Sequence, residues 1–150
     1  MRIEPVREAD VGDLLPMLAD YCAFYEVDPG RDRLEALVRA LLKRPDEGRQ
    51  LIARDDRQEA TGFATVYWTW STLVGDRIGV LHDLYVRPEH RRNGVGRALI
   101  DACLEQAGAR GVARLGWDTA PGNSAAQRLY DSLPDVHRSE WVAYSLGVPS

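Results

Sequence analysis

A basic turn that contains two glycines is the stretch of this sequence best suited to chemistry. It reads Arg91-Arg92-Asn93-Gly94-Val95-Gly96-Arg97 and lies between a predicted strand and a predicted helix. The first turn of a helix offers unpaired backbone N–H groups at the positive end of the helix dipole, and these groups attract anions. Gly94 and Gly96 leave room for a bulky anion to reach the backbone. Because the arginines add positive charge, we expect the turn to bind a pyrophosphate.

Two common phosphate-binding patterns do not match this turn. The segment lacks the Gly-x-x-x-x-Gly-Lys-Ser/Thr pattern of a P-loop. It also lacks the three glycines of a dinucleotide-binding turn, and the elements predicted before it come in the wrong order for that fold. A solvated basic turn that only caps a helix is the alternative interpretation.

Hydrophobic periodicity predicts the elements that position this turn. Strands are predicted at residues 2–6, 50–54, 60–70, 78–86, 113–117 and 141–146. Helices are predicted at residues 10–26, from about 34 to a stop before Pro45, at 94–110 and at 123–133. Pro16 is expected to kink the first helix or delay its start. The order β-α-α-β-β-β-α-β-α-β favours an α+β or mixed α/β fold with helices on the faces of a mixed sheet.

Length and composition predict a single soluble domain over residues 1–150. The chain has 45% hydrophobic residues, 28% charged residues and a net charge of −4. No apolar run approaches the roughly 18 residues of a membrane span, and no signal segment follows Met1, so we expect a cytoplasmic protein with no membrane partner. The acidic balance argues against nucleic acid as a partner. Cys22 and Cys103 are expected to be buried thiols, and no metal site is predicted.

The glycine turn resembles the acyl-CoA-binding signature of the GCN5-related N-acetyltransferases, the GNAT superfamily. The matching pattern is Arg91-x-x-Gly94-x-Gly96 after Leu84-Tyr85-Val86-Arg87-Pro88. The order of elements and the segment from Asn123 to Tyr130 agree with the same family, so the resemblance covers nearly the whole chain. Within the family, Tyr21-x-x-Phe24-Tyr25 and His82-Asp83-Leu84-Tyr85-Val86 are most similar to the diamine and histone/polyamine-type acetyltransferases.

The resemblance implies a GNAT-like acyl-CoA N-acyltransferase fold, in which helices flank a central, mixed and mostly antiparallel sheet. It also implies acetyl-CoA as cosubstrate, with the pantetheine arm paired to the backbone of Leu84, Tyr85 and Val86. The pyrophosphate contacts carried over by the motif are Arg91, Arg92, Asn93, Gly94, Val95, Gly96 and Arg97. Further cofactor contacts are Asn123, Ser124, Ala126 and Tyr130. The Gly-Phe turn common after the tyrosine is replaced here by residues 131–136, so the last hairpin is expected to differ.

Acetyl transfer to an amine needs a neutral nucleophile, a donor for the developing oxyanion and a proton for the leaving thiolate. The family implies a backbone N–H near Tyr85 or Val86 as the oxyanion donor. Tyr130 is the expected general acid, and a core-packing aromatic is the alternative. For the base, Asp83 and His82 are candidates, as is solvent alone. Neighbours on a strand point to opposite faces unless a bulge intervenes.

The expected acceptor is a small cationic amine. Aromatic and acidic residues at the end of the first helix and in the next loop are the candidate binding residues, namely Tyr21, Phe24, Tyr25, Glu26 and Asp28. Such groups suit a cation, although the two tyrosines also fit a buried helix face. The alternative functions are acetylation of a protein lysine or N-terminus, and acyl-CoA binding without turnover. Trp68 and Trp70 share one strand face and suit either a core or a homodimer contact, and the resemblance favours a homodimer.

Overall fold

The computed structural model describes residues 1–150, which divide into two units, Met1–Asp118 and Thr119–Ser150. The first unit holds a five-stranded sheet in the order β1-β2-β3-β4-β5. Its strands are β1 (Arg2–Pro5), β2 (Gly48–Arg54), β3 (Ala60–Ser71), β4 (Asp76–Val86) and β5 (Leu115–Gly116). Neighbouring strands are antiparallel except for β4 and β5, which are parallel. The expected mixed, mostly antiparallel sheet is therefore confirmed.

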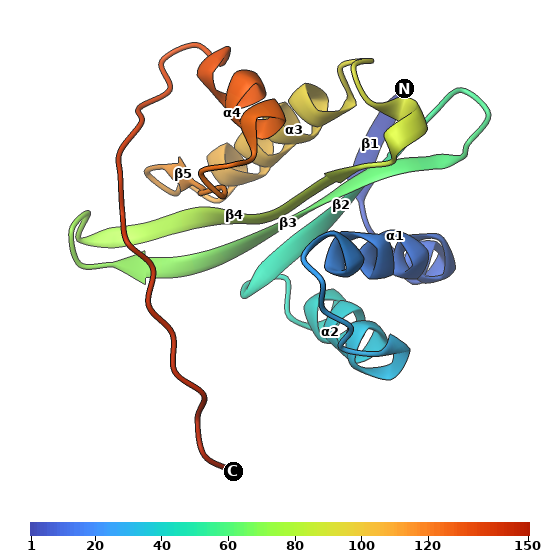
Figure 1. Cartoon of the computed structure of the whole chain (residues 1–150), viewed down its shortest axis with the longest axis horizontal. Helices are drawn as coiled ribbons and strands as arrows, with labels where there is room; N and C mark the ends of the chain where they lie inside the picture. The colour runs from blue at the N-terminus through green and yellow to red at the C-terminus, as the bar shows by residue number, and fades with distance from the viewer. The chain divides into compact units, whose positions relative to one another are not determined.

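Three helices cover the two faces of this sheet. They are α1 (Val11–Phe24), α2 (Arg31–Lys43) and α3 (Val95–Ala109), with short 3₁₀ turns η1 (Glu8–Asp10) and η2 (Pro88–His90). Figure 1 shows α1 and α2 on one face and α3 on the other. This arrangement follows from the chain order, because a hairpin-linked β2–β3–β4 run needs cover on both of its apolar faces.

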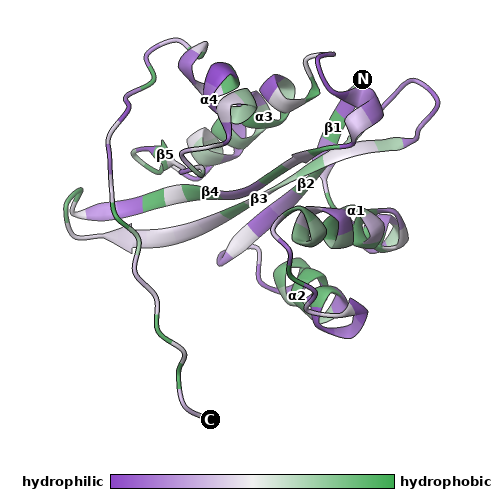
Figure 2. Cartoon of the chain, viewed as in Figure 1, coloured by the Kyte–Doolittle hydropathy of each residue, from purple (hydrophilic) through white to green (hydrophobic).

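Side chains at helical spacing attach α1 and α2 to the sheet. Leu14, Met17 and Leu18 of α1 are buried and belong to the same core cluster as Phe63 of β3. Leu34 and Val38 of α2 complete this cluster. Figure 2 shows the corresponding contrast, with much of α1 apolar and the turn between β2 and β3 hydrophilic. Burial of these side chains is the main force that fixes the helices to the strands.

The beginning of α1 differs in detail from the prediction. Pro16 lies inside the helix, which begins at Val11 and so is not delayed. Asp10 occupies the N-cap position of α1, but its side chain makes no capping hydrogen bond there. Instead its carboxylate accepts hydrogen bonds from the Arg7 backbone N–H at 2.8 Å and from Arg54 at 2.7 Å. Asp10 therefore links the N-terminus of the helical layer to β2.

Cys103 and Trp68 are core residues on the α3 side of the sheet. Burial raises the pKa of the Cys103 thiol to about 12, and Trp68 packs with Val66 and Ala107. Trp70, on the same strand, is 72% exposed. Of the two tryptophans, only Trp70 is left as a candidate for a contact between subunits. Cys22 is a free thiol like Cys103 but is only partly buried.

The second unit contains α4 (Ser124–Asp131) and an extended C-terminal segment. The strand predicted at residues 141–146 is wrong, because this segment forms no strand and has no ladder partner. Its large apolar side chains are exposed, at 84% for Trp141, 91% for Tyr144 and 95% for Leu146. β-Propensity reflects packing against neighbouring strands, so the residue types alone do not make a strand. None of the chain's helices combines the length and apolar character of a bilayer span.

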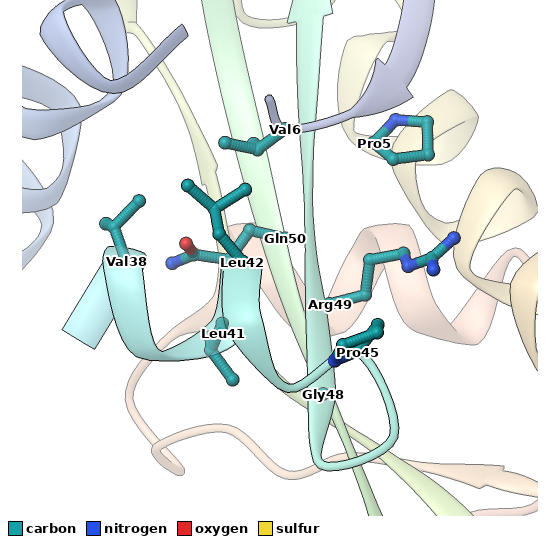
Figure 3. Close-up of a pocket in the computed structure, with 9 residues that line it drawn as sticks. All are labelled: Pro5, Val6, Val38, Leu41, Leu42, Pro45, Gly48, Arg49 and Gln50. Carbon is teal, nitrogen blue, oxygen red and sulfur yellow. The ribbon is translucent and has the colours of Figure 1, made fainter. Parts of the chain in front are cut away.

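A small pocket lies between α2 and the beginning of β2, next to the last residue of β1 (Figure 3). Its volume is about 150 Å³, and it is lined by Pro5, Val6, Val38, Leu41, Leu42, Pro45, Gly48, Arg49 and Gln50. Ligand-binding pockets usually measure roughly 300–1,000 Å³. This pocket is therefore too small for a nucleotide-bearing cosubstrate, and the candidate site must lie elsewhere.

Candidate active site

The glycine turn begins α3 with open backbone donors. Gly94 caps the helix with a left-handed backbone, at φ +79°. The first hydrogen bond of the helix runs from the Ala98 N–H to the Gly94 carbonyl at 3.0 Å. The N–H groups of Val95, Gly96 and Arg97 therefore precede the helical ladder and point out of its positive end. This is the geometry that the pyrophosphate prediction requires.

The arginines of the turn are not equivalent. The Arg91 Nε donates to the Val86 carbonyl at 3.0 Å, which ties the turn to the end of β4. The Arg97 Nε lies 3.1 Å from both carboxylate oxygens of Asp101, one helical turn further on. Arg92 is exposed and has a left-handed backbone at φ +64°. The sequence suggested three equivalent charges, whereas the structure leaves Arg92 as the guanidinium without a protein partner.

One edge of β4 is not covered by another strand beyond Val80. β5 pairs with β4 only at Gly79 and Val80. From Leu81 to Val86 the backbone is paired with β3 on the other side alone. The resemblance implied that Leu84, Tyr85 and Val86 pair with a pantetheine arm, and an open strand edge supplies the backbone donors and acceptors for such pairing.

His82 forms a bulge in β4, near the beginning of this open edge. Asp83 is paired with Thr65 and Leu81 with Val66, so His82 is the extra residue between two consecutive residues of β3. A bulge re-aims side chains that would otherwise alternate between the sheet faces. As a result, the His82 Nδ1 lies 3.3 Å from the Asp83 Oδ1. The structure brings the two candidate bases together as one pair.

Tyr21 and Tyr67 flank this pair from different elements. The Tyr21 hydroxyl of α1 donates to the His82 carbonyl at 3.5 Å. Burial raises the pKa of Tyr21 well above its usual value, and the neighbouring Asp83 carboxylate raises it further. Burial and Asp83 also raise the pKa of Tyr67 on β3. Both phenols therefore stay neutral beside a carboxylate that attracts cations.

Sequence reasoning missed Tyr67. The signal was present, because Phe63, Thr65 and Tyr67 alternate along β3 and face the same side of the sheet. Gly48 on the neighbouring strand β2 is a second sign, since a Cβ there would lie 2.7 Å from the Tyr67 Cδ1. That pairing could be found only once the register of β2 and β3 was known.

The predicted acceptor residues divide into two groups. Tyr21 lies at the site, and its ring contacts Tyr25 at a centroid distance of 5.1 Å. Phe24 contacts the outer side of Tyr25 and is 61% exposed. Glu26 and Asp28 lie in the exposed loop after α1, and the Asp28 carboxylate accepts a hydrogen bond from the Gly30 N–H at 2.9 Å. Tyr21, Tyr25 and Phe24 form an aromatic run that leads from the partly buried Asp83 to an acidic, solvent-exposed loop.

The predicted residues Asn123, Ser124, Ala126 and Tyr130 belong to α4 and its cap in the second unit. The Asn123 side chain accepts a hydrogen bond from the Ala126 N–H at 3.2 Å and so acts as the N-cap of the helix. Tyr130 is half-buried, one residue before the last residue of α4. Their proposed contacts with the cosubstrate stay predictions carried by the motif.

A separate group of possible metal ligands is formed by the turn between β2 and β3 together with the end of η2. Asp55, Glu59 and His90 each place one potential ligand atom within 4.8 Å of the others. One Asp55 oxygen already accepts hydrogen bonds from the backbone N–H groups of Arg57 and Glu59, both at 2.9 Å. Asp55 is thus explained as the residue that closes this turn.

Comparison with known proteins identifies the family of this chain and supports its fold. Residues 14–133 match the Acetyltransferase (GNAT) family. The chain belongs to this family. Along its whole length it is 29% identical to YhfO, an uncharacterized N-acetyltransferase of Bacillus subtilis, and the match covers 99% of that relative. The crystal structure of a probable acetyltransferase is 26% identical, with a TM-score of 0.86 that covers 100% of this chain and 99% of the other.

A relative with a named acceptor supports the resemblance to diamine-type GNAT enzymes. The thialysine N-epsilon-acetyltransferase of Caenorhabditis elegans is 36% identical over 92 residues, which cover 59% of this chain and 57% of the relative. The GNAT fold, the named relatives and the open donors at α3 agree that the protein is an acetyl-CoA-dependent acyltransferase. The resemblance derived from the glycine turn is therefore confirmed.

Proposed function

We propose that the protein transfers the acetyl group of acetyl-CoA to a primary amine of a small cationic acceptor, by direct attack in a ternary complex. The observation that carries this proposal is the His82–Asp83 pair, which lies at a bulge beside the uncovered edge of β4. A GNAT enzyme needs its thioester and its acceptor amine at one point. Here an open backbone edge and a carboxylate–imidazole pair meet on one strand.

Acetyl-CoA is proposed to follow β4 toward α3. Its pyrophosphate would accept hydrogen bonds from the N–H groups of Val95, Gly96 and Arg97, with Arg92 as the nearby free charge. Its pantetheine arm would pair with Leu84, Tyr85 and Val86 along the uncovered edge. Asn123, Ser124 and Ala126 are the proposed further contacts.

The transfer forms one C–N bond and breaks one C–S bond. The amine attacks the thioester carbon, and a backbone N–H near Tyr85 or Val86 stabilises the negative charge on the carbonyl oxygen, which is worth roughly 3 kcal/mol when the donor is well placed. Collapse of the tetrahedral intermediate expels the thiolate. Tyr130 is proposed to supply the proton for the sulfur. The His82–Asp83 pair is the proposed destination of the amine's proton.

The site chemistry favours a cationic acceptor. Tyr21 and Tyr67 present neutral aromatic rings beside Asp83, and Glu26 and Asp28 add carboxylates at the exposed end. A relative that acetylates the epsilon nitrogen of thialysine supports an amine on a flexible chain. A basic amino acid or a polyamine would satisfy both requirements.

Release of free thiol tests the proposal. Purified protein and acetyl-CoA are incubated with a panel of diamines, basic amino acids, neutral aryl amines and lysine peptides. Turnover on the small cationic amines is expected. Preferential turnover on the peptides would instead indicate a protein acetyltransferase. Acetyl-CoA binding by calorimetry without turnover on any amine would indicate a binding module.

A further inference from the structure

The His82 imidazole is held between a carboxylate and an aromatic ring. Its Nδ1 lies 3.3 Å from the Asp83 Oδ1, and its ring meets the Tyr67 ring edge-to-face, with 5.4 Å between centroids and 74° between planes. The His82 side chain is 64% exposed, whereas the Asp83 side chain is only 17% exposed. The sheltered carboxylate thus anchors an imidazole whose other edge is open to the solvent side.

We propose that His82 is the general base of the transfer and that Tyr67 is a positioning residue that holds its imidazole for this role. The inference rests on the proposed acetyl transfer and adds two residue roles to it. An ionised Asp83 can only accept hydrogen bonds, so it selects the tautomer with the proton on Nδ1 and the lone pair on Nε2. The Nε2 atom is therefore the one that receives a proton.

His82, Asp83 and solvent, together with the proposed acid Tyr130, account for every proton that the reaction moves. The acceptor enters as an ammonium ion and passes one proton to the His82 Nε2, which forms an imidazolium paired with Asp83. The neutral amine then attacks the thioester carbon. The second nitrogen proton passes to solvent after attack, Tyr130 protonates the thiolate to give the thiol, and the Tyr130 phenolate regains a proton from solvent. The imidazolium releases its proton to solvent, so the net products are amide, thiol and one proton.

The other titratable groups around His82 are poor bases. Burial and Asp83 raise the pKa values of Tyr21 on α1 and Tyr67 on β3, so both remain protonated. Burial also raises the pKa of Cys22, with smaller effects from Asp83 and Asp28. Among these groups, the His82 imidazole is the one whose side chain is mostly exposed, at 64%.

The position of Tyr67 is specified by its neighbours. It is paired with Gly48 on β2 and with Val80 on β4. A Cβ at position 48 would lie 2.7 Å from the Tyr67 Cδ1, so glycine leaves the space that the ring occupies. Edge-to-face contact between aromatic rings is favourable, and it restricts the imidazole that the bulge would otherwise leave free to rotate.

Substitution of Tyr67 separates positioning from the phenol's own chemistry. Tyr67→Leu removes the ring and should lower kcat roughly tenfold, while the KM for acetyl-CoA stays unchanged. Tyr67→Phe keeps the ring and should retain kcat near that of the parent. Equal losses in both variants, or no loss in the Leu variant, would overturn the positioning role. Thermal melting and calorimetry with acetyl-CoA verify that each variant is folded.

Substitution of His82 tests the base. His82→Gln should lower kcat by roughly 10²-fold, and the rising limb of its pH profile should lose one ionisation. His137→Gln is the matched control, because His137 lies in the exposed C-terminal segment, and it should leave the profile unchanged. An unaltered rising limb in the His82 variant would overturn the assignment.

Nitrogen-15 NMR of the imidazoles gives a readout that does not depend on activity. The His82 signal is identified by its loss in His82→Gln, and the parent should show the Nδ1–H tautomer. Tyr67→Leu should show a mixture of tautomers. An Nε2–H tautomer in the parent would overturn the inference even in an active enzyme. Failure to acetylate any amine, with the expected tautomer present, would instead count against the proposed function.

Discussion

At the scale of single residues, Gly94 shapes the turn at which the pyrophosphate is proposed to bind. Its left-handed backbone, at φ +79°, sets the direction in which α3 begins. A Cβ added there would meet no atom within 4 Å, so the cost of substitution is conformational and not steric. A non-glycine residue in this conformation costs roughly 1–2 kcal/mol.

Gly94→Val is therefore expected to weaken acetyl-CoA binding while the fold persists. The variant relieves its backbone strain by moving residue 94 out of the left-handed region, which turns the N–H groups of residues 95–97 away from the pyrophosphate. Calorimetry should show at least a tenfold loss of affinity. Gly108→Ala, within the same helix and also with open space around its Cβ, is the control and should bind normally. Unchanged affinity in a folded Gly94 variant would contradict the pyrophosphate assignment.

Tyr130 is the residue whose hydroxyl is expected to matter most for the chemical step. Tyr130→Phe removes one oxygen and keeps the aromatic ring, and thermal melting verifies that the variant is folded. Turnover should fall by roughly 10²-fold, since the thiolate would leave without its acid. Acetyl-CoA affinity should be unaltered. Turnover at the parent rate would mean that the sulfur takes its proton from another donor.

At the scale of elements, Asp10 joins the helical layer to the sheet. Its side chain is sheltered and bonded to Arg54 at 2.7 Å. Burial opposes ionisation of Asp10, but the hydrogen bonds from Arg54 and from the Arg7 backbone, together with their charges, hold its pKa below the usual value. A lowered carboxyl pKa stabilises the folded state above the unfolded pKa of about 3.9, and this stabilisation is lost as the pH falls through the folded value.

Asp10→Asn should therefore destabilise the protein by about 2 kcal/mol at neutral pH, because it leaves Arg54 without its buried partner. The difference from the parent should shrink below about pH 4. Urea unfolding at both pH values measures it. Asp56→Asn, at a carboxylate that is 96% exposed, should change stability by less than about 0.5 kcal/mol. A loss of the same size in both variants would rule out the buried pair as the cause.

At the scale of the whole molecule, charge is expected to guide the acceptor. The net charge is −4, and the exposed end of the aromatic run carries Glu26 and Asp28. Salt screens such attraction, so kcat/KM for a diamine should fall as ionic strength rises. The value for a neutral aryl amine should not.

Glu26→Gln tests whether this carboxylate itself attracts the cationic acceptor. It should raise the KM for cationic acceptors severalfold and leave that for neutral acceptors unchanged. Asp28 is less suitable, since it also accepts the hydrogen bond of Gly30. Glu105→Gln on α3 is the control, because α3 covers the opposite face of the sheet (Figure 1). Equal changes in the two Gln variants would show that only overall charge matters.

Features that depend on local order can be predicted from the amino-acid sequence. The glycine turn, the periodic faces of α1, α2 and α3, and the alternation along β3 and β4 are encoded by neighbouring residues, and they sufficed for the family, the fold class and the cosubstrate. Tertiary structure decided the features that depend on pairing between distant residues. The register of β3 against β4 creates the bulge that joins His82 to Asp83. The two-residue length of β5 leaves the β4 edge uncovered, and the lack of a ladder partner leaves residues 141–146 without a strand. Register and strand pairing are set by packing across the sheet, which no local pattern records.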